Sequence, residues 1–543
     1  MTRPLQAASI AAPALRGLNT QDSSVTLEDG FALRADNCII DKFGRLGSRK
    51  GWLQRTSELA GGGSASGVVL LGIHHFVDFA GAKTTLSWSA TQFYTGFATL
   101  TPLNLENTAN DEAITTGNWM AATLNDLCYF FQIGRKPLVY DPTTGDLTTL
   151  KDYVSPASVA AATTGLPSAG FVMSAFGRLW AVGTAASKTK ISFSSINDGT
   201  KWDGGSSGSL DISSVFPKGT DTITGLASHN GSLIILCKNS IVVYDDTGGF
   251  GEYTSAMDVE DLNLTDIIYG IGCIAAKTIV NTGEDVLFLD STGVRSIGRT
   301  IQEKSRPLRD VSKNVRDDVI EAVHQTTNKD DITAIYSPID AFYLLAFPPL
   351  GSAFCFDTKG MLEDGSFRVT TWSGISHRAY TFDPILDEIH IAETGGIGKY
   401  MGYTDNGSSY NMSYYTNHFD MGNSSTTKIL KNMNVTLIGS TGQAFTIKIG
   451  TDYSTIYTSH PYTLRSGTVY EYGSAEYGTD GTQTDPATKP SLAEYSSGIF
   501  TESVRAAVGG AGTILQAGLE ATIDGGLLSV QKLDILTKVG RTI

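Results

Sequence analysis

A turn followed by a hydrophobic strand recurs through the middle of this sequence at a nearly constant spacing. Each copy has a small or acidic turn, a hydrophobic strand, a second turn and another strand that often ends in an aromatic residue. The turns are centred on residues 82, 126, 178, 232, 286, 341 and 388, so neighbouring copies lie 44 to 55 residues apart. A period of about 40–50 residues with two to four short strands is typical of β-propeller blades, which bury their faces against one another.

We therefore predict an all-β chain with a β-propeller of about seven blades over residues 66–404. The 59 glycines against 16 prolines, with 22 tyrosines and 23 phenylalanines, favour many short strands joined by tight turns. The alternative is a β-rich chain whose hairpins fall at this spacing by chance.

Strands without this repeat are expected at both ends of the chain. Residues 1–65 form an opening segment that ends in a glycine-rich linker, and residues 405–543 form a second β region. Within that region we expect a hairpin of residues 435–438 with 445–449, and two closing strands at 515–523 and 527–536. The two ends are predicted to form one β platform or sandwich into which the propeller is inserted. Residues 471–490 are predicted to be an extended tip loop.

One amphipathic helix is expected near residues 310–324. Val311, Val315, Val319, Ile320 and Val323 recur at helical spacing and give one apolar stripe. We expect this helix to dock on a neighbour, either in the same chain or in another subunit.

The balance of charge argues against a protein that grips nucleic acid. With 55 acidic and 40 basic residues the formal net charge is −15, and no lysine- or arginine-rich patch stands out. The densest basic stretch, 304–316, contains Asp310 and is followed by Asp317 and Asp318, so we interpret it as a mixed-charge helix face. An acidic surface would let DNA pass without adhering.

The cysteines and the hydropathy profile suggest a chain that stays in a reducing compartment. The five cysteines lie far apart, without a C-x-x-C pair, which favours free thiols over disulfides or a zinc site. Residues 1–15 resemble a signal peptide only weakly, because Gln6, Ser9 and Pro13 interrupt a short alanine-rich run. No stretch approaches 18 apolar residues, so no membrane span is expected.

One motif supports the propeller. The segment from Ser195 to Trp202 resembles the Asp-box turn of some propellers, S-x-[DN]-x-G-x-x-W. In such turns the polar side chains bond the backbone and the tryptophan packs under the blade. A single copy favours a structural turn over the mark of a glycosidase.

Other motif matches have simpler interpretations. Residues 204–208 match G-x-S-x-G but lie in a Gly/Ser tract, without the strand and helix of a nucleophile elbow. His74 and His75 lack metal-ligand spacing and are expected to pack in the core or across strands. The acidic group lacks the order of a calcium loop, although adventitious Ca²⁺ is an alternative; it comprises Asp258, Glu260, Asp261 and Asp266. We predict no catalytic, cofactor-binding or metal-binding residues, no cofactor, and no enzymatic activity.

Short motifs follow one another in a set order along the whole chain, namely Gly17-Leu18-Asn19, Ala35-Asp36-Asn37, Gly44-Arg45-Leu46, Arg49-Lys50-Gly51-Trp52, the 195–202 turn, 231–244, Ser305-Arg306-Pro307-Leu308, Gln516-Ala517-Gly518-Leu519 and 528–533. In this order they resemble the tail nozzle, or tail tubular (stabilisation), proteins of short-tailed bacteriophages.

The resemblance implies a structural virion protein of the tail, assembled in the host cytoplasm. Such proteins form a ring, usually a hexamer, below the portal and adaptor proteins. They extend and close the DNA ejection channel and support tail fibres or spikes, while double-stranded DNA passes without sequence-specific binding. The 471–490 tip would be a subunit or channel contact. The competing interpretations are a secreted β-propeller glycosidase or lectin, and a non-viral propeller interaction module.

Overall fold

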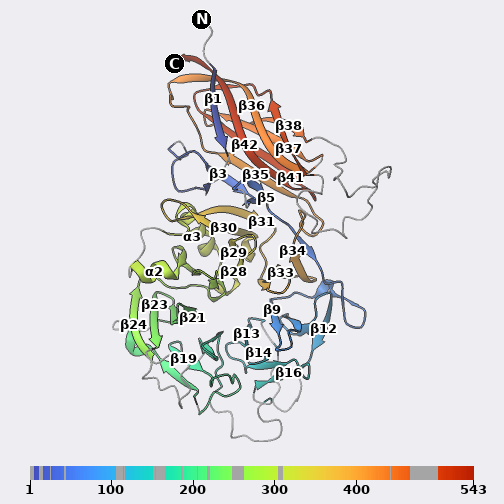
Figure 1. Ribbon diagram of the computed structural model, residues 1–543, viewed down its shortest axis with the longest axis vertical. Coiled ribbons are helices and arrows are strands. Elements are labelled where there is room, and N and C mark those ends of the chain that lie inside the picture. Colours follow the sequence, from blue (N-terminus) through green and yellow to red (C-terminus); the bar gives the residue numbers. More distant parts are fainter. Residues whose placement is uncertain are drawn as a thin grey trace.

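A computed structural model shows a ring of β-sheet blades with a β-sandwich attached to its rim (Figure 1). It describes residues 5–542 except 12–15, 25, 42–43, 106–113, 115–116, 151–152, 154–165, 185–186, 205, 217–220, 247–261, 304–309, 441 and 465–498. The predicted tip at 471–490 therefore lies outside the described residues.

Seven blades follow one another round the ring, and the innermost strand of each comes first in sequence. Blade 1 consists of β9 (Gly72–Val77), β10 (Lys83–Trp88), β11 (Phe93–Thr95) and β12 (Thr99–Leu103). Blade 2 consists of β13 (Met120–Leu124), β14 (Leu127–Phe131), β15 (Leu138–Asp141) and β16 (Asp146–Thr149). Blade 3 consists of β17 (Phe171–Ala175), β18 (Arg178–Val182), β19 (Lys190–Phe193) and β20 (Gly208–Asp211). Blade 4 consists of β21 (Ile223–His229), β22 (Ser232–Cys237), β23 (Ser240–Asp246) and β24 (Leu262–Tyr269), and blade 5 of β25 (Val280–Asn281), β26 (Val286–Asp290) and β27 (Gly293–Ser296). Blade 6 consists of β28 (Thr333–Ser337), β29 (Phe342–Phe347), β30 (Ser352–Met361) and β31 (Phe367–Ser373). Blade 7 consists of β32 (Ala379–Asp383), β33 (Glu388–Glu393), β34 (Gly396–Tyr400) and β6 (Trp52–Gln54).

The repeated turns of the sequence are the hairpins between the two innermost strands of each blade. The turn at 126 joins β13 to β14, and the turn at 388 joins β32 to β33. Every pair of adjacent blades encloses its own apolar cluster, as the stacking of sheets round an axis requires. The prediction of an all-β chain with about seven blades is confirmed.

The ring is closed by a strand that precedes the first blade in sequence. Strand β6 pairs antiparallel with β34, with Trp52 opposite Tyr400, and so becomes the outer strand of blade 7. Two short strands that follow it, β7 (Glu58–Leu59) and β8 (Gly63–Ser64), extend the sheet of blade 1. The domain boundary expected at residue 65 is therefore wrong, because backbone pairing with the end of the propeller recruits residues 52–54 into it.

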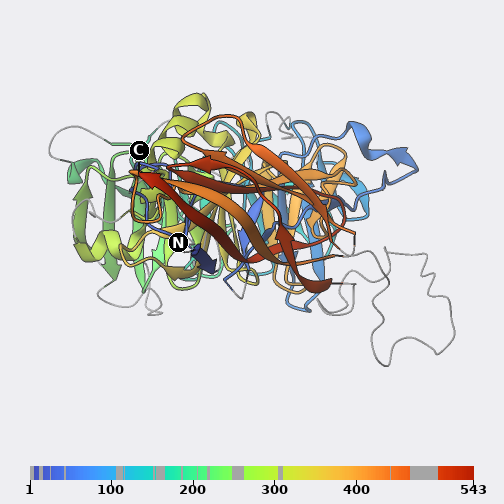
Figure 2. The same cartoon turned by 90° about the horizontal axis from the view of Figure 1, so that it is seen from above.

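The two ends of the chain form a sandwich, which we call the platform. Its first sheet contains β1 (Leu5–Ala11), β4 (Cys38–Ile40), β5 (Leu46–Ser48), β36 (Thr426–Ser440), β39 (Ile499–Ala506), β40 (Ala511–Gly512) and β42 (Leu528–Thr542). Its second sheet contains β2 (Gly17–Leu18), β3 (Phe31–Asp36), β35 (Tyr410–Thr416), β37 (Ala444–Thr451), β38 (Thr458–Thr463) and β41 (Leu515–Ile523), and continues through β3 into β31 of blade 6. Viewed from above, the long platform strands lie obliquely over part of the propeller (Figure 2).

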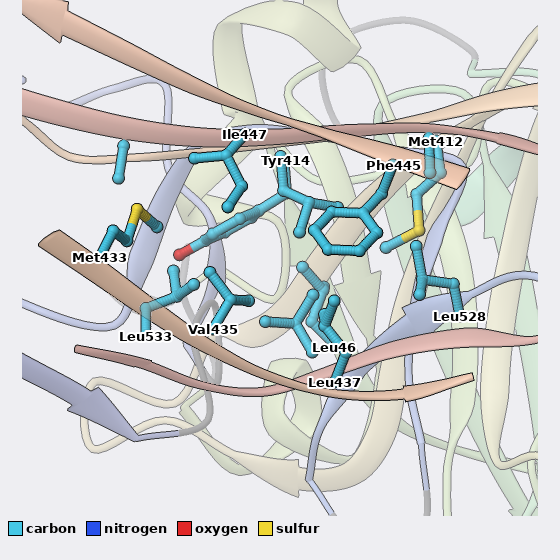
Figure 3. Close-up of a cluster of buried hydrophobic side chains, with 14 of the residues drawn as sticks. Leu46, Met412, Tyr414, Met433, Val435, Leu437, Phe445, Ile447, Leu528 and Leu533 are labelled. Atoms are coloured by element: carbon cyan, nitrogen blue, oxygen red, sulfur yellow. The ribbon is translucent and has the colours of Figure 1, made fainter. Parts of the chain in front are cut away.

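Alternating side chains of the two platform sheets meet in one buried core (Figure 3). Val435 and Leu437 of β36 face Phe445 and Ile447 of β37 across this core. The expected hairpin between these strands is wrong, because β36 pairs with β42 and β39 while β37 pairs with β41 and β38. The turn between them crosses from one sheet to the other, and a period-two pattern cannot distinguish that crossing from a hairpin.

Two α-helices lie beside blades 5 and 6, namely α2 (Ile297–Glu303) and α3 (Arg316–Gln325). Short 3₁₀ turns occur at Ala65–Gly67, Ser213–Val215, Ala276–Thr278, Lys313–Val315, Lys329–Asp331 and Pro348–Leu350. The expected apolar stripe packs on the seam between blades 5 and 6 of the same chain through Val319 and Val323. The helix starts later than 310 because Ser312 is bound to the blade, where its hydroxyl accepts a hydrogen bond from the Val294 amide.

Helix α2 was not expected from the sequence. Its first turn is held by the carboxylate of Asp285, which accepts hydrogen bonds from the Ser296 hydroxyl and the Gly298 amide. This acceptor comes from 13 residues before Gly298, so no local capping pattern indicates it.

Candidate functional site

Three of the sequence segments that carry the family resemblance lie along the boundary between the platform and the propeller. Residues 17–19 pair with the start of β3, residues 35–37 end β3, and residues 49–52 lead from β5 into β6. Of these segments, 35–37 and 49–52 contact each other. We call this region the joint and define it by Asn37, Arg49, Gly51, Ser373 and Asp405. It contains several of the polar contacts between the platform and the propeller.

Arg49 lies at the centre of the joint, and its side chain is fully buried. Its guanidinium binds Asp405 through two parallel hydrogen bonds, from Nη1 to Oδ1 at 2.8 Å and from Nη2 to Oδ2 at 2.6 Å. The remaining donors bind Asn37 Oδ1 at 2.8 Å, the Lys50 carbonyl at 3.0 Å and the Ser373 carbonyl at 2.6 Å. All five N–H donors of the guanidinium therefore have an acceptor, which fixes the orientation of the group.

Asn37 is the second central residue of the joint. Its φ of 55° lies in the left-handed region, which asparagine tolerates better than most residues. Its amide nitrogen donates to the Ser373 hydroxyl at 2.9 Å and to the Asn411 carbonyl at 2.7 Å, while its oxygen accepts from the Ser373 amide. The side chain thereby joins blade 6 to platform strand β35.

Close backbone contact explains the glycine in the same motif. A Cβ on Gly51 would lie 1.9 Å from the Thr404 carbonyl oxygen, so no larger residue fits there. The adjacent Trp52 amide donates to that carbonyl at 3.0 Å. Beside them Lys50 forms an ion pair with Asp340 at 3.0 Å, and the Tyr410 ring lies 4.0 Å from the Arg49 guanidinium.

An open cleft of about 870 Å³ lies between the joint, blade 6 and platform strands β35, β37, β38 and β41. Its two acidic residues are both engaged in hydrogen bonds. Asp36 accepts from Arg34 and Thr371, and Glu520 accepts from Tyr415 and Lys448. Burial opposes ionisation of Glu520, but these hydrogen bonds outweigh it and lower its pKa.

A second polar cluster lies at the seam between blades 7 and 1, where the ring closes. His75 of β9 and His390 of β33 approach with 2.8 Å between His75 Nε2 and His390 Nδ1. Asp383, at the end of β32, lies beside them, and one ligand atom from each of the three residues falls within 4.8 Å of the others. The Lys83 ammonium forms an ion pair with Asp383.

The outer nitrogens of both histidines are also bound. His75 Nδ1 lies 3.2 Å from the Thr85 hydroxyl, and His390 Nε2 lies 3.4 Å from Glu388 Oε2. Burial, reinforced by the His390 charge, lowers the pKa of His75 to about 3, and burial also lowers the pKa of His390. Both rings are therefore neutral near pH 7 and can act as ligands.

The structure packs His74 and His75, which were expected to lie in the core or across strands, into the two opposite seams of blade 1. His74 Nε2 lies 3.0 Å from the Thr123 hydroxyl of blade 2, an ordinary cross-blade contact. His75 points to the opposite seam, because neighbouring strand residues face opposite sides of a sheet. His390 follows His75 by 315 residues, so the sequence around His75 does not indicate this contact.

The Asp-box-like segment forms a structural turn between β19 and β20. The Asp198 carboxylate accepts hydrogen bonds from the Thr200 amide at 2.9 Å and from its hydroxyl at 2.5 Å. Trp202 is buried at the seam of blades 2 and 3, with its ring 5.7 Å from that of Phe131. This is the arrangement expected from the sequence.

The G-x-S-x-G match does not form a nucleophile elbow. The Ser206 hydroxyl accepts from the Ile196 amide, and the residues that follow begin strand β20 instead of a helix. Of the acidic group, Asp266 lies in β24, whereas Asp258, Glu260 and Asp261 lie outside the described residues. Residues 304–309 of the basic stretch also lie outside them, and its Lys313 forms an ion pair with Asp364 at 2.8 Å.

Within the described part of the chain, none of the helices is both long and apolar enough to cross a membrane. All five cysteines are buried free thiols.

Comparisons with known proteins identify no family. No protein-family model and no curated protein matches the chain. Among solved structures it is similar to PorZ, a surface component of the type-IX secretion system of Porphyromonas gingivalis, at 10% identity and a TM-score of 0.30 over 76% of this chain. It spans only 46% of PorZ. A protein from Lactobacillus plantarum is similar at 11% identity and a TM-score of 0.31, over 64% of this chain and 91% of that one. At such scores neither likeness supports an argument about function.

Proposed function

We propose that this chain is a structural virion protein, the tail nozzle subunit of a short-tailed bacteriophage. In this proposal several copies, six in the expected case, form a ring below the portal and adaptor, extend and close the DNA ejection channel, and support tail fibres or spikes. The observation that carries the proposal is that two of the family-like segments, 35–37 and 49–52, meet at the joint between the platform and the propeller. A subunit that transmits load between a ring and a peripheral body needs a fixed angle between its parts, and a fully bonded arginine provides it.

The charge of the chain is consistent with this role. A net charge of −15 disfavours lasting contact with the phosphate backbone, so DNA would slide through the ring without strong binding.

The state of the cleft carboxylates supports a non-enzymatic role. Glycoside hydrolysis needs one carboxylic acid that is protonated near neutral pH and a second carboxylate facing it. Glu520 has a lowered pKa and is bound by Tyr415 and Lys448, so it is a poor general acid. Asp36 is occupied by Arg34 and Thr371.

Electron microscopy of the purified full chain tests the proposal, first alone and then with the portal–adaptor complex of the same virus. A ring with a central hole, alone or on the adaptor, is the expected result. A chain that stays monomeric in both conditions would contradict the proposal. Turnover of any member of a panel of glycosides, or saturable binding to a glycan array, would instead favour the glycosidase or lectin alternative.

A further inference from the structure

The seam between blades 7 and 1 differs chemically from the rest of the ring. Its apolar cluster is small, and beside it lie two histidines, two carboxylates and two lysines from five strands. His390 is 1% exposed and the Asp383 side chain is fully buried. Burying such groups is costly unless each one is paired or binds a metal.

The hydrogen bonds of the two histidines leave ligand atoms facing one point. Glu388 is an acceptor, so His390 carries its proton on Nε2 and presents the lone pair of Nδ1 to His75. The Thr85 hydroxyl can donate to His75 Nδ1 or accept from it, so the proton of His75 can occupy either nitrogen. Moving that proton to Nδ1 frees Nε2 as a second ligand without any change of charge.

We propose that His75 Nε2, His390 Nδ1 and a carboxylate oxygen of Asp383 form a binding site for one divalent transition-metal ion of the zinc class. Two imidazoles and a carboxylate are a common ligand set for such ions, with a fourth position left for water. Thr85 and Glu388 orient the rings from behind, as outer-shell partners of metal-bound histidines do. Zinc–nitrogen bonds of about 2.0–2.1 Å place two tetrahedral ligand atoms about 3.3 Å apart, so the rings need only a small outward movement.

Lys83 is the competitor for this site. Its ammonium binds the Asp383 carboxylate in the absence of metal and would be repelled by a divalent ion. The Lys83 side chain is 22% exposed, so it can turn outward when the ion enters. The two backbone amides of Ile385 and Leu386 bind the other carboxylate oxygen, Oδ1, and keep Asp383 in position during the exchange.

A bound ion would connect the first blade to the last. His75 belongs to blade 1, whereas Asp383 and His390 belong to blade 7, and β6 holds blade 7 from the outside. The metal would thus be a second closure of the ring, near the axis. This inference does not depend on the proposed function, since its test measures metal binding and not assembly.

The test uses the full chain without a polyhistidine tag, freed of metal with a chelator. We expect calorimetric titration with ZnCl₂ to give one site per chain, zinc to raise the melting temperature, and Co²⁺ to give the intense visible bands of a four- or five-coordinate ion. Loss of an outer-shell partner typically weakens metal binding by up to about 100-fold. H75Q and H390Q each remove a direct ligand, so each should weaken zinc binding by more than that. D383N should weaken it as well.

Two further variants separate the site from general binding to histidines. H74Q is the matched control, because this neighbouring buried histidine faces Thr123 in blade 2 and should leave zinc binding unchanged. K83M keeps all three ligands and should bind zinc more tightly than the unmodified chain. Circular dichroism in chelator checks that each variant is folded.

The proposal is overturned if the folded chain binds no stoichiometric zinc, or if binding survives both H75Q and H390Q. If H75Q and H390Q do not fold, the test uses Co²⁺ spectra of the unmodified chain and of K83M. A spectrum of a six-coordinate, oxygen-bound ion in both chains would overturn the proposal. A K83M chain that binds no more tightly would overturn the assignment of Asp383 as the third ligand.

Discussion

The joint and the blade seams hold large parts of the molecule together by opposite means. The seam between blades 1 and 2 is a cluster of buried apolar and aromatic side chains that includes Phe93, Trp119 and Phe130. The joint depends instead on one arginine whose five donors all have specified acceptors. Apolar packing resists separation but tolerates substitutions that keep the volume, whereas a bidentate ion pair also fixes an angle.

The largest effect is expected from breaking the joint. Asp405→Ala leaves the buried Arg49 guanidinium without its carboxylate, and removing one partner of a buried pair costs about 3–5 kcal/mol. We expect a lower midpoint in denaturant and faster proteolysis near residues 404–408. Arg49→Lys should also destabilise, because an ammonium cannot reproduce the planar fork. If the double variant R49M/D405L costs the sum of R49M and D405L measured singly, the pair is not coupled and the contrast with the seams fails.

A seam should respond to lost volume and not to altered chemistry. Leu138 is fully buried at the seam of blades 1 and 2, and Leu138→Ala is expected to cost about 2–5 kcal/mol. Leu138→Met, which nearly conserves volume, should cost less than about 1.5 kcal/mol. Equal losses in the two variants, measured by chemical unfolding, would mean that the seam is as specific as the joint.

A half-exposed ion pair should contribute much less than the buried one. The Lys313–Asp364 pair connects the segment before α3 to the turn between β30 and β31. Burial opposes ionisation, but the hydrogen bonds from Lys313 and Ser366 lower the pKa of Asp364 to about 2. The folded pKa lies below the unfolded one, so this stabilisation is present above about pH 4 and is lost as the pH falls toward 2.

Because the Lys313 side chain is 52% exposed, we expect the pair to contribute at most about 1 kcal/mol. Unfolding of the unmodified chain and of K313M, followed between pH 5 and 2, should differ by no more than that. A difference as large as that of D405A would show that burial does not set the strength of these pairs.

The smallest effect is expected where neither kind of contact exists. Phe79 lies in the inner hairpin turn of blade 1 and is 80% exposed. Phe79→Ser should change the free energy of unfolding by less than about 0.5 kcal/mol. A larger loss of stability would indicate that the turn is covered by another part of the protein or by a second copy.

The sequence predicts the propeller better than it predicts the joint or the histidine cluster. Blade hairpins are local, and a turn such as Asn230-Gly231 places two strands together whatever happens elsewhere in the chain. The partners Arg49 and Asp405 are 356 residues apart, and His75 and His390 are 315 residues apart. No periodicity connects positions at such separations, so only the closed ring reveals them. For a related reason the sequence does not show that β36 and β37 belong to different sheets, because alternation specifies a buried face but not the partner strand.

Strand β6 precedes blade 1 in sequence but belongs to blade 7, and this limits the order in which the parts of the molecule can fold. Blades 1 to 6 consist of neighbouring segments and can stack as they emerge from the ribosome. Trp52, however, cannot pair until Tyr400 has been translated, and Ser9 in β1 cannot pair until Asp534 in β42 has been translated. During synthesis the early strands therefore carry unpaired edges, and a chain interrupted before blade 7 would keep them exposed to aggregation. The pairing of β6 is thus possible only after β34 has been translated, and that of β1 only after β42.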